Sequence, residues 1–421
     1  MRSSVSILFA GLLFSASCFS QKIRSEHISY YYSKLPSAPL DRSVKNYTAK
    51  IDAVYEQKNK QLKADYERAL QRADSSYKAE LASYPSRLKA ADDKYEKELA
   101  EYNKKSVGTR VVEKNILGEN NKPVKQVLSE PVRQHVPSPV LQTSYDYPVL
   151  ANTYLQLQGY ASGAENAVQL IVTFYGFDFT EPRVLSVQKD MVSVSKGTTT
   201  KYKATYYHTE FSYRHPMSVK VIGPGGRELL NLTPQLLNVY KIYRSPESQT
   251  VPSNNPELLI KTNEEKILQE NLQYIGQLVN DQFGFSKTER KAGIYYVKEK
   301  GDTYNDLSLA LNEVSSGLRL IYDDSTLAKP KLLRAIDIWK NALKESNPAD
   351  KKARIDKDVT IAIYFNLLEA YFALSNANAG FDVLRQMNTL SLSAGDRRDR
   401  DEMELLFTDL KKRQQVNQSI L

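Results

Sequence analysis

Cysteine is nearly absent from this chain of 421 residues, which contains only one, and histidine and tryptophan are scarce, at four and one. A lone cysteine cannot form an intramolecular disulfide, whereas exported eukaryotic domains commonly rely on disulfides. No two histidines have the i, i+4 spacing that places two zinc ligands on one helical face. We therefore expect a chain without disulfides, metal ions or other cofactors.

Recognisable catalytic motifs are missing as well. The chain has no Gly-x-Ser-x-Gly nucleophile turn, and its Gly-Pro-Gly-Gly stretch at 223–226 lacks the Gly-Lys-Ser/Thr ending of a phosphate-binding loop. Its carboxylates are numerous but not clustered as a two-acid glycosidase would suggest. We expect a non-enzymatic protein. The alternative that stays open is an enzyme whose site is dispersed in sequence, for example a glycan hydrolase.

The apolar run at the start of the chain, Val5–Phe14, has about ten residues, half of what a membrane-spanning helix needs. A short basic stretch precedes it, and mostly small residues follow it up to Ser20. This order is typical of a signal peptide, here residues 1–20. We therefore expect an exported protein with Gln21 as its first mature residue.

Export without disulfides favours a bacterial envelope, either the periplasm or the outer-membrane surface. Cys18 offers an alternative, because a bacterial lipoprotein carries its lipid on the first mature cysteine. Ser15, however, stands where a lipoprotein signal has a bulky apolar residue. We expect plain cleavage rather than a lipid anchor, with a lipid-anchored accessory subunit of an outer-membrane assembly as the alternative.

Basic residues outnumber acidic ones, which gives a formal net charge of +9. The excess is spread along the chain and does not form the basic stripe with aromatic residues that is typical of nucleic-acid binding. We expect no nucleic-acid partner, while peripheral contact with a membrane surface stays open.

Residues 52–104 are predicted to be helical, because they are rich in Ala, Glu, Lys, Leu and Gln and contain no glycine. Apolar residues recur every eleven positions, which corresponds to ~3.67 residues per turn and a nearly straight contact face. Pro85 predicts either a kinked helix or an antiparallel hairpin. We expect a coiled-coil-like arm that contacts a partner or a second copy of this chain. One row of the repeat is Leu62, Ala73, Tyr84 and Tyr95, and the candidate interaction surface is the other row, Tyr66, Tyr77, Leu88 and Leu99.

The segments around the arm differ from it in composition. Residues 21–51 are expected to form an extended arm and a strand, with Tyr30-Tyr31-Tyr32 packed on the β domain. Residues 105–150 contain several prolines and are expected to be a linker, with a small hairpin between 111–112 and 124–128. Residues 151–245 predict an antiparallel β-sandwich, because short alternating segments, the first at 153–158, are separated by turn signals.

Residues 246–256 are expected to be a second linker, and residues 257–421 a mainly helical domain. Within it, Ala335, Trp339 and Ala342 have the spacing Ala-x-x-x-aromatic-x-x-Ala, and Tyr364, Leu367, Leu368 and Tyr371 have the spacing of a preceding helix. This pattern resembles the tetratricopeptide (TPR) repeats. Leu368 replaces the family's small residue, and a weaker second match, Gly380, Leu384 and Met387, begins 45 residues after Ala335 instead of the usual ~34.

The resemblance implies a helical-repeat domain that binds peptides or proteins, with an irregular helical bundle as the alternative. The predicted fold class is therefore a multi-domain α+β protein: a β-sandwich body, an inserted helical arm and a C-terminal TPR-like domain. The predicted function is protein binding or scaffolding in the bacterial envelope. Trp339 is expected to be buried between helices and not to stack on a ligand.

The order of segments in residues 1–20 predicts that the mature protein lacks them. In its native host, the protein should fractionate with the envelope, and mass spectrometry of its N-terminal peptide should find Gln21 first. A cytoplasmic protein that retains Met1–Ser20 would contradict export. A lipid-modified Cys18 at the N-terminus would instead establish the lipoprotein alternative.

Overall fold

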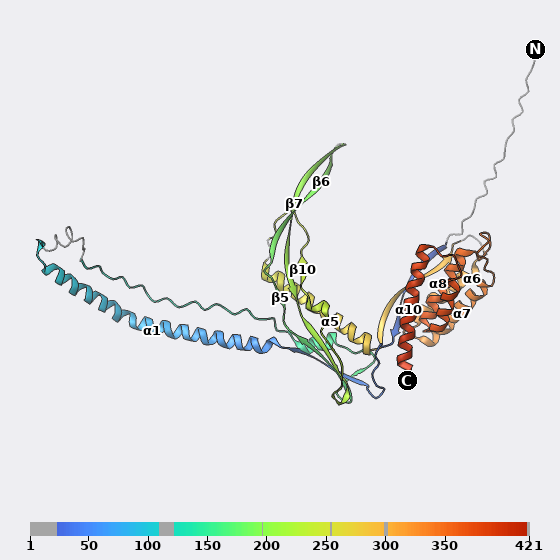
Figure 1. The fold of residues 1–421 in the computed structure, drawn as a ribbon, viewed down its shortest axis with the longest axis horizontal. Coiled ribbons are helices and arrows are strands. Elements are labelled where there is room, and N and C mark those ends of the chain that lie inside the picture. The colour runs from blue at the N-terminus through green and yellow to red at the C-terminus, as the bar shows by residue number, and fades with distance from the viewer. Residues whose placement is uncertain (1–22, 109–121, 196, 253–254, 299–301, 419–421) are drawn as a thin grey trace, which may run out of the picture.

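The computed structural model describes residues 23–108, 122–195, 197–252, 255–298 and 302–418, so the predicted signal peptide and residues 111–112 lie outside the described residues. The protein is mixed α+β, as expected, and elongated. A long helical arm projects to one side of a central sheet region, a β-ribbon projects from that region in another direction, and a helical bundle lies at the opposite side (Figure 1).

A five-stranded sheet forms the central region, with the strand order β3-β2-β4-β8-β9. β2 runs parallel to β3 and β4, and the remaining pairs are antiparallel. The sheet and its flanking elements are β2 (Asn46–Ala53), α3 (Tyr147–Tyr154), β3 (Ala161–Ser162), β4 (Ala167–Phe174), β8 (Met217–Ile222), η1 (Pro224–Gly226), β9 (Glu228–Leu232), α4 (Gln235–Asn238) and α5 (Pro256–Phe283).

The core of this region lies between the sheet and helix α5. Alternate residues of β4, from Val168 to Phe174, are buried, as the period-2 pattern predicts. They pack in one cluster with Leu272, Ile275 and Val279 of α5. Helix α5 therefore belongs to the packing of the sheet, although its place in the sequence suggested the C-terminal helical domain.

The expected antiparallel β-sandwich is not confirmed, because helices and not a second sheet cover this core. The strand expected at 153–158 is wrong, since residues up to Tyr154 form α3. Asp146 caps this helix by accepting a hydrogen bond from the Val149 N–H, and Pro148 occupies its first turn. Both are helix-start signals, and they outweighed the alternation around Tyr154.

A second sheet extends from this region as the ribbon in Figure 1. Its two long strands are paired antiparallel, and two short strands join the second of them near the body. These elements are β5 (Asp178–Phe179), β6 (Arg183–Ser195), β7 (Thr198–Arg214) and β10 (Lys241–Arg244).

The helical bundle is built on a two-stranded sheet of β1 (Ile23–Lys34) and β11 (Ser286–Val297). Neither segment was predicted to be a strand, and the residues that pair between the two strands are more than 250 positions apart in sequence. Tyr30 of β1 is buried in the bundle core, and the Tyr32 ring lies edge-on to Phe372, with centroids 5.1 Å apart. The expectation that this tyrosine run packs on the β domain is therefore wrong.

Five helices complete the bundle, and two of them, α6 and α8, pack against this small sheet. α7, α8 and α9 begin after Asp324, Asp356 and Asn376, whose side chains accept hydrogen bonds from first-turn N–H groups. The helices are α6 (Asn305–Leu320), α7 (Ser325–Leu343), α8 (Lys357–Ala373), α9 (Ala377–Met387) and α10 (Ala394–Gln418). None of the helices in the described ranges is long and apolar enough to cross a membrane.

Arg413 connects the bundle to the central region. Its guanidinium donates hydrogen bonds to both carboxylate oxygens of Asp281 in α5, at 3.0 and 3.1 Å, and to the Leu35 carbonyl, at 2.8 Å. Lys34 donates to the same carboxylate at 2.6 Å. Partial burial alone would raise the Asp281 pKa, but these hydrogen bonds outweigh it and lower that pKa below its usual value. The ionised junction is therefore most stable above the usual carboxyl pKa and weakens as the pH falls through the lowered one.

Trp339 is 1% exposed and packs in the bundle core with Ala335 and Ala342. Trp339→Ala should lower the free energy of unfolding of the bundle by ~3–5 kcal/mol, through lost burial and cavity formation. Urea unfolding followed by circular dichroism measures this cost. Leu333→Ala on the same helix is the matched control, because Leu333 is 51% exposed. Equal costs for the two variants would contradict a core role for Trp339.

Candidate functional site

The helical arm is a single helix, α1 (Tyr55–Lys104), which continues through Pro85. Its 50 residues correspond to a length of about 75 Å. This excludes the antiparallel hairpin within residues 55–104. The chain does turn back after the helix, because residues 122–146, expected to be a linker, run along the arm toward the central sheet (Figure 1).

The returning segment 122–146 contacts α1 at points spread along the helix. Lys125 forms an ion pair with Asp92 (3.0 Å), and Arg133 with Asp74 (3.3 Å). Tyr84 donates a hydrogen bond to the Leu128 carbonyl, and Gln142 pairs with Asn59. These contacts run in opposite order along the two segments, so the returning segment is antiparallel to the helix.

The contact positions show that the returning segment is extended. Asn59 and Asp92 are 33 residues apart, about 50 Å of helix. Their partners Gln142 and Lys125 are only 17 residues apart, so this segment spans about 2.9 Å per residue, near the ~3.1 Å of polyproline II. The prolines of this segment favour the polyproline II conformation. Residues 124–128 do not form a strand, so the expected hairpin strand at this position is wrong.

An eight-residue repeat in this segment is the sequence signal that composition alone missed. Pro-Val-x-Gln occurs at 123–126, 131–134 and 139–142. The prolines of the three copies are half-buried, while Val124, Val132 and Val140 are 84–88% exposed. The third position supplies Lys125 and Arg133, the two residues that pair with aspartates of α1. The repeat thus places its prolines and the two basic residues where they can contact the helix, and its valines where they face solvent.

Side-chain amides hold the root of the arm. The buried Asn59 accepts from the Gln142 N–H and donates to the Gln142 carbonyl. The Gln142 amide in turn accepts from the Phe177 N–H at 2.7 Å and donates to its carbonyl at 3.3 Å. Gly176, with φ of +107°, allows this approach, because a Cβ there would lie 3.0 Å from the Gln142 Oε1 atom. The arm is therefore fastened to the sheet region through backbone groups.

One residue of the face predicted as an interaction surface, Tyr66, contacts the returning segment. Tyr66 and Tyr77 are half-buried, and the Tyr66 hydroxyl accepts a hydrogen bond from Ser138. Leu99 is also half-buried, while Leu88 is 37% exposed. At Tyr66 and Tyr84 the residues of the eleven-residue repeat therefore take part in packing within the arm, where residues 122–146 follow the helix.

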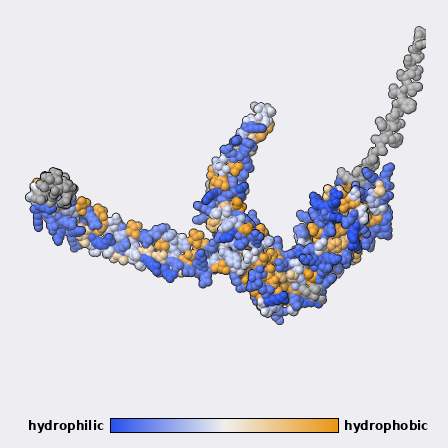
Figure 2. Space-filling view, in the orientation of Figure 1, coloured by the Kyte–Doolittle hydropathy of each residue, from blue (hydrophilic) through white to orange (hydrophobic). Residues whose placement is uncertain are grey.

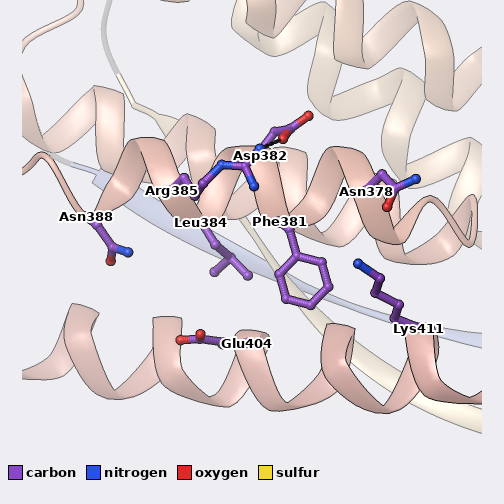
Figure 3. Close-up of a pocket in the computed structure, with 8 residues that line it drawn as sticks. All are labelled: Asn378, Phe381, Asp382, Leu384, Arg385, Asn388, Glu404 and Lys411. Carbon is purple, nitrogen blue, oxygen red and sulfur yellow. Dashed lines mark hydrogen bonds and ion pairs between the residues drawn. The ribbon is translucent and has the colours of Figure 1, made fainter.

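Two hollows flank helix α9 in the helical bundle. The first, about 500 Å³, lies between α9 and α10. Figure 3 shows Phe381 and Leu384 directed from α9 toward α10, with Lys411 rising from α10 beside the Phe381 ring. The Lys411 ammonium is 5.4 Å from that ring's centroid, and Arg385 pairs with Asp382 at the rim. The hollow thus combines an apolar floor with charged walls.

The second hollow, about 460 Å³, lies on the other side of α9, between α7 and α8. It is lined by Tyr364, Leu367 and Tyr371, which the sequence assigned to the TPR-like framework, and by Lys340 and Lys344. The Lys340 ammonium lies 5.8 Å from the Tyr371 ring centroid, and burial raises the pKa of Tyr364. The sequence pattern gave no sign of the two lysines.

Histidines do not form a site in the described residues. His208 and His215 are both buried, and His215 packs edge-on to the rings of Phe174 and Phe177, each with a centroid distance of 5.7 Å. Burial lowers the pKa of His215 to about 4, so it is neutral at neutral pH. No group of three or more His, Cys, Asp or Glu side chains that could hold a metal ion occurs in the described part of the chain.

No family model, no curated protein and no solved structure matches this chain.

The Tyr66→Asp, Tyr77→Asp double substitution tests the packing of the arm. Placing two carboxylates under the returning segment should release residues 122–146 from α1, while the solvated helix and the central sheet persist. Limited proteolysis should then cut this segment at least several-fold faster, with little change in circular dichroism. Leu81→Asp is the control, because Leu81 is 48% exposed on the same helix. Equal cleavage rates in the two variants would show that Tyr66 and Tyr77 do not hold the segment.

Proposed function

We propose that this chain is an exported, non-enzymatic protein of a bacterial envelope that binds other proteins and holds them in place. The observation that carries this proposal is the pair of hollows on either side of α9, whose volumes of about 500 and 460 Å³ and mixed apolar and charged linings suit polypeptide side chains. The second combines two exposed lysines with tyrosines, a mixture that favours partners with acidic and apolar residues. The first combines Phe381 with two basic and two acidic side chains.

The packing of the bundle supports the resemblance to TPR repeats. Ala335 and Ala342 are buried beside Trp339, which lets α7 approach its neighbours closely. Gly380 serves the same purpose in α9, because a Cβ there would lie 2.2 Å from the Phe407 ring of α10. Close antiparallel packing of this kind leaves concave surfaces between helices, and helical-repeat proteins use such surfaces to bind peptides.

The shape of the molecule supports a scaffold. The arm extends about 75 Å from its root, and the bundle lies on the opposite side of the central sheet (Figure 1). Partners bound at the bundle and near the arm would therefore be held far apart. In this proposal the arm contributes its outward side, because Tyr66 and Tyr84 of its repeat already contact residues 122–146.

Site-specific photo-crosslinking in the native host tests the role of the hollows. A crosslinking residue at Gln386 or Lys411, which line the second and first hollows, should capture a defined envelope protein. The same residue at the exposed position Leu333, which lines neither hollow, should not. Lys340→Glu with Lys344→Glu should reduce capture at Gln386 at least fivefold, because both basic side chains at that hollow become acidic.

Lys329→Glu is the matched charge control, since Lys329 is exposed at the start of α7 and lines neither hollow. Its capture at Gln386 should equal that of the unchanged protein. Equal capture at Leu333 and Gln386, or no effect of the double substitution, would contradict binding in the hollows.

A further inference from the structure

The ribbon of β6 and β7 has an unused edge. The two strands are paired without interruption from Arg183↔Glu210 to Ser195↔Thr198. On the other side of β7, β10 pairs only with residues 210–213, near the body. Among the described residues, nothing pairs with the outer edge of β6, and Figure 1 shows the ribbon projecting away from the rest of the molecule.

This edge lacks the usual protection against strand pairing. Natural edge strands are commonly short, bulged, rich in lysine or interrupted by proline. β6 has 13 residues, contains no proline and keeps a regular register with β7. Its only charged residues after Arg183 are the neighbours Lys189 and Asp190. A row of free backbone N–H and C=O groups therefore faces solvent along an extended strand.

The side chains of β6 are those of a strand within a larger sheet. Val184, Val187, Val192 and Val194 are β-branched and 39–71% exposed, and successive residues point to opposite faces. Figure 2 shows hydrophobic surface along the ribbon as well as in the body. A two-stranded ribbon alone is marginally stable in water, so a third strand would add both backbone hydrogen bonds and side-chain contacts on each face.

Charge indicates which kind of strand fits. The paired residues of the ribbon, 183–195 and 198–210, contain four basic residues, Arg183, Lys189, Lys201 and Lys203, and two acidic ones, Asp190 and Glu210. Glu210 lies opposite Arg183. Asp190 lies opposite Lys203, and Lys189 is paired with Glu247. Lys201 lies opposite Val192 and makes no ion pair in the described part of the chain. The ribbon therefore favours an acidic partner.

We propose that the free edge of β6 binds an extended, acidic, β-branched segment of a partner protein, which adds to the ribbon as a third strand. Backbone hydrogen bonds supply much of the affinity in this mode of recognition, and alternate side chains supply the selectivity. A lipid surface fits less well, because unpaired backbone groups along the strand would be costly in hydrocarbon. This surface is separate from the hollows beside α9.

A synthetic peptide tests the proposal on the full-length mature protein. The probe is a labelled twelve-residue peptide in which valine or threonine alternates with glutamate, and binding is followed by fluorescence anisotropy. N-methylation of every peptide bond removes the N–H groups on both sides of the strand, and the expected loss of affinity is at least tenfold. Replacing every glutamate with lysine should abolish binding. Hydrogen exchange should show new protection in residues 183–195 and unchanged exchange in α7–α9.

Variants of the protein provide matched tests and controls for the peptide experiment. Successive residues of an edge strand direct their N–H groups alternately toward the neighbouring strand and toward solvent. Of the two variants Val187→Pro and Gln188→Pro, one therefore removes an outward N–H group, and this variant should block peptide binding while leaving the β6–β7 pairing intact. Lys201→Glu should weaken binding at least fivefold. Lys97→Glu, at an exposed position of the arm, should have no effect, and neither should the Lys340→Glu, Lys344→Glu pair that tests the hollows.

Several results would overturn the proposal. These are no binding of the acidic peptide, binding that survives N-methylation, or protection outside the ribbon. Protection of 183–195 by phosphatidylglycerol vesicles but not by the peptide would assign the ribbon to a membrane surface. A dimer in sedimentation experiments that the effective proline variant abolishes would assign the edge to a second copy of this chain.

Discussion

The contact between Arg413 and Asp281 is the interaction on which the arrangement of the two halves depends. Arg413 lies on the last helix, Asp281 near the end of α5, and the carbonyl of Leu35, which also accepts from Arg413, just after β1. Three segments distant in sequence therefore meet at one guanidinium, whose side chain is 7% exposed. Its planar, multiple-donor geometry suits this role, whereas a lysine could not bind the carboxylate at two points. Removing Arg413 would leave Asp281 paired with Lys34 alone, and removing Asp281 would leave Arg413 paired only with Asp409 of its own helix, so in both cases the two halves would lose this contact.

Side-chain amides recur wherever extended chain meets another element. Asn366 of α8 donates to the Tyr295 carbonyl and accepts from its N–H, so it satisfies the outer edge of β11. Asn280 does the same for the backbone of Gln156 and Gln158, and Asn59 for Gln142. An amide side chain carries one donor and one acceptor side by side, like a peptide group. These residues therefore end sheets and fasten loops without requiring another strand. The outer edge of β6 has no such partner in the described residues, which distinguishes it from β11.

Long periodic elements could be predicted because their signals are local. The arm helix, strand β4 and the alanines around Trp339 all show their period within a few turns or a few residues. The binding surfaces could not be predicted in this way. Lys340 and Tyr371 meet only because α7 and α8 pack together, and Tyr66 and Tyr84 of the eleven-residue repeat contact residues 122–146 of the same chain. Periodicity identifies a face that is buried, but it does not identify what covers it.

The sequence by itself determined the class of the protein, mixed α+β, the position of the arm helix and the helical character of most of the C-terminal region, because helix composition, periodicity and turn residues act over short distances. Only the tertiary structure decided that β1 pairs with β11, that α5 covers the sheet and that the tyrosines of β1 serve the bundle. Both strands are irregular in hydrophobicity, since each is buried on parts of one face only. Their pairing joins residues more than 250 positions apart, and its stability comes from the surfaces that the whole fold brings together, which no local pattern encodes.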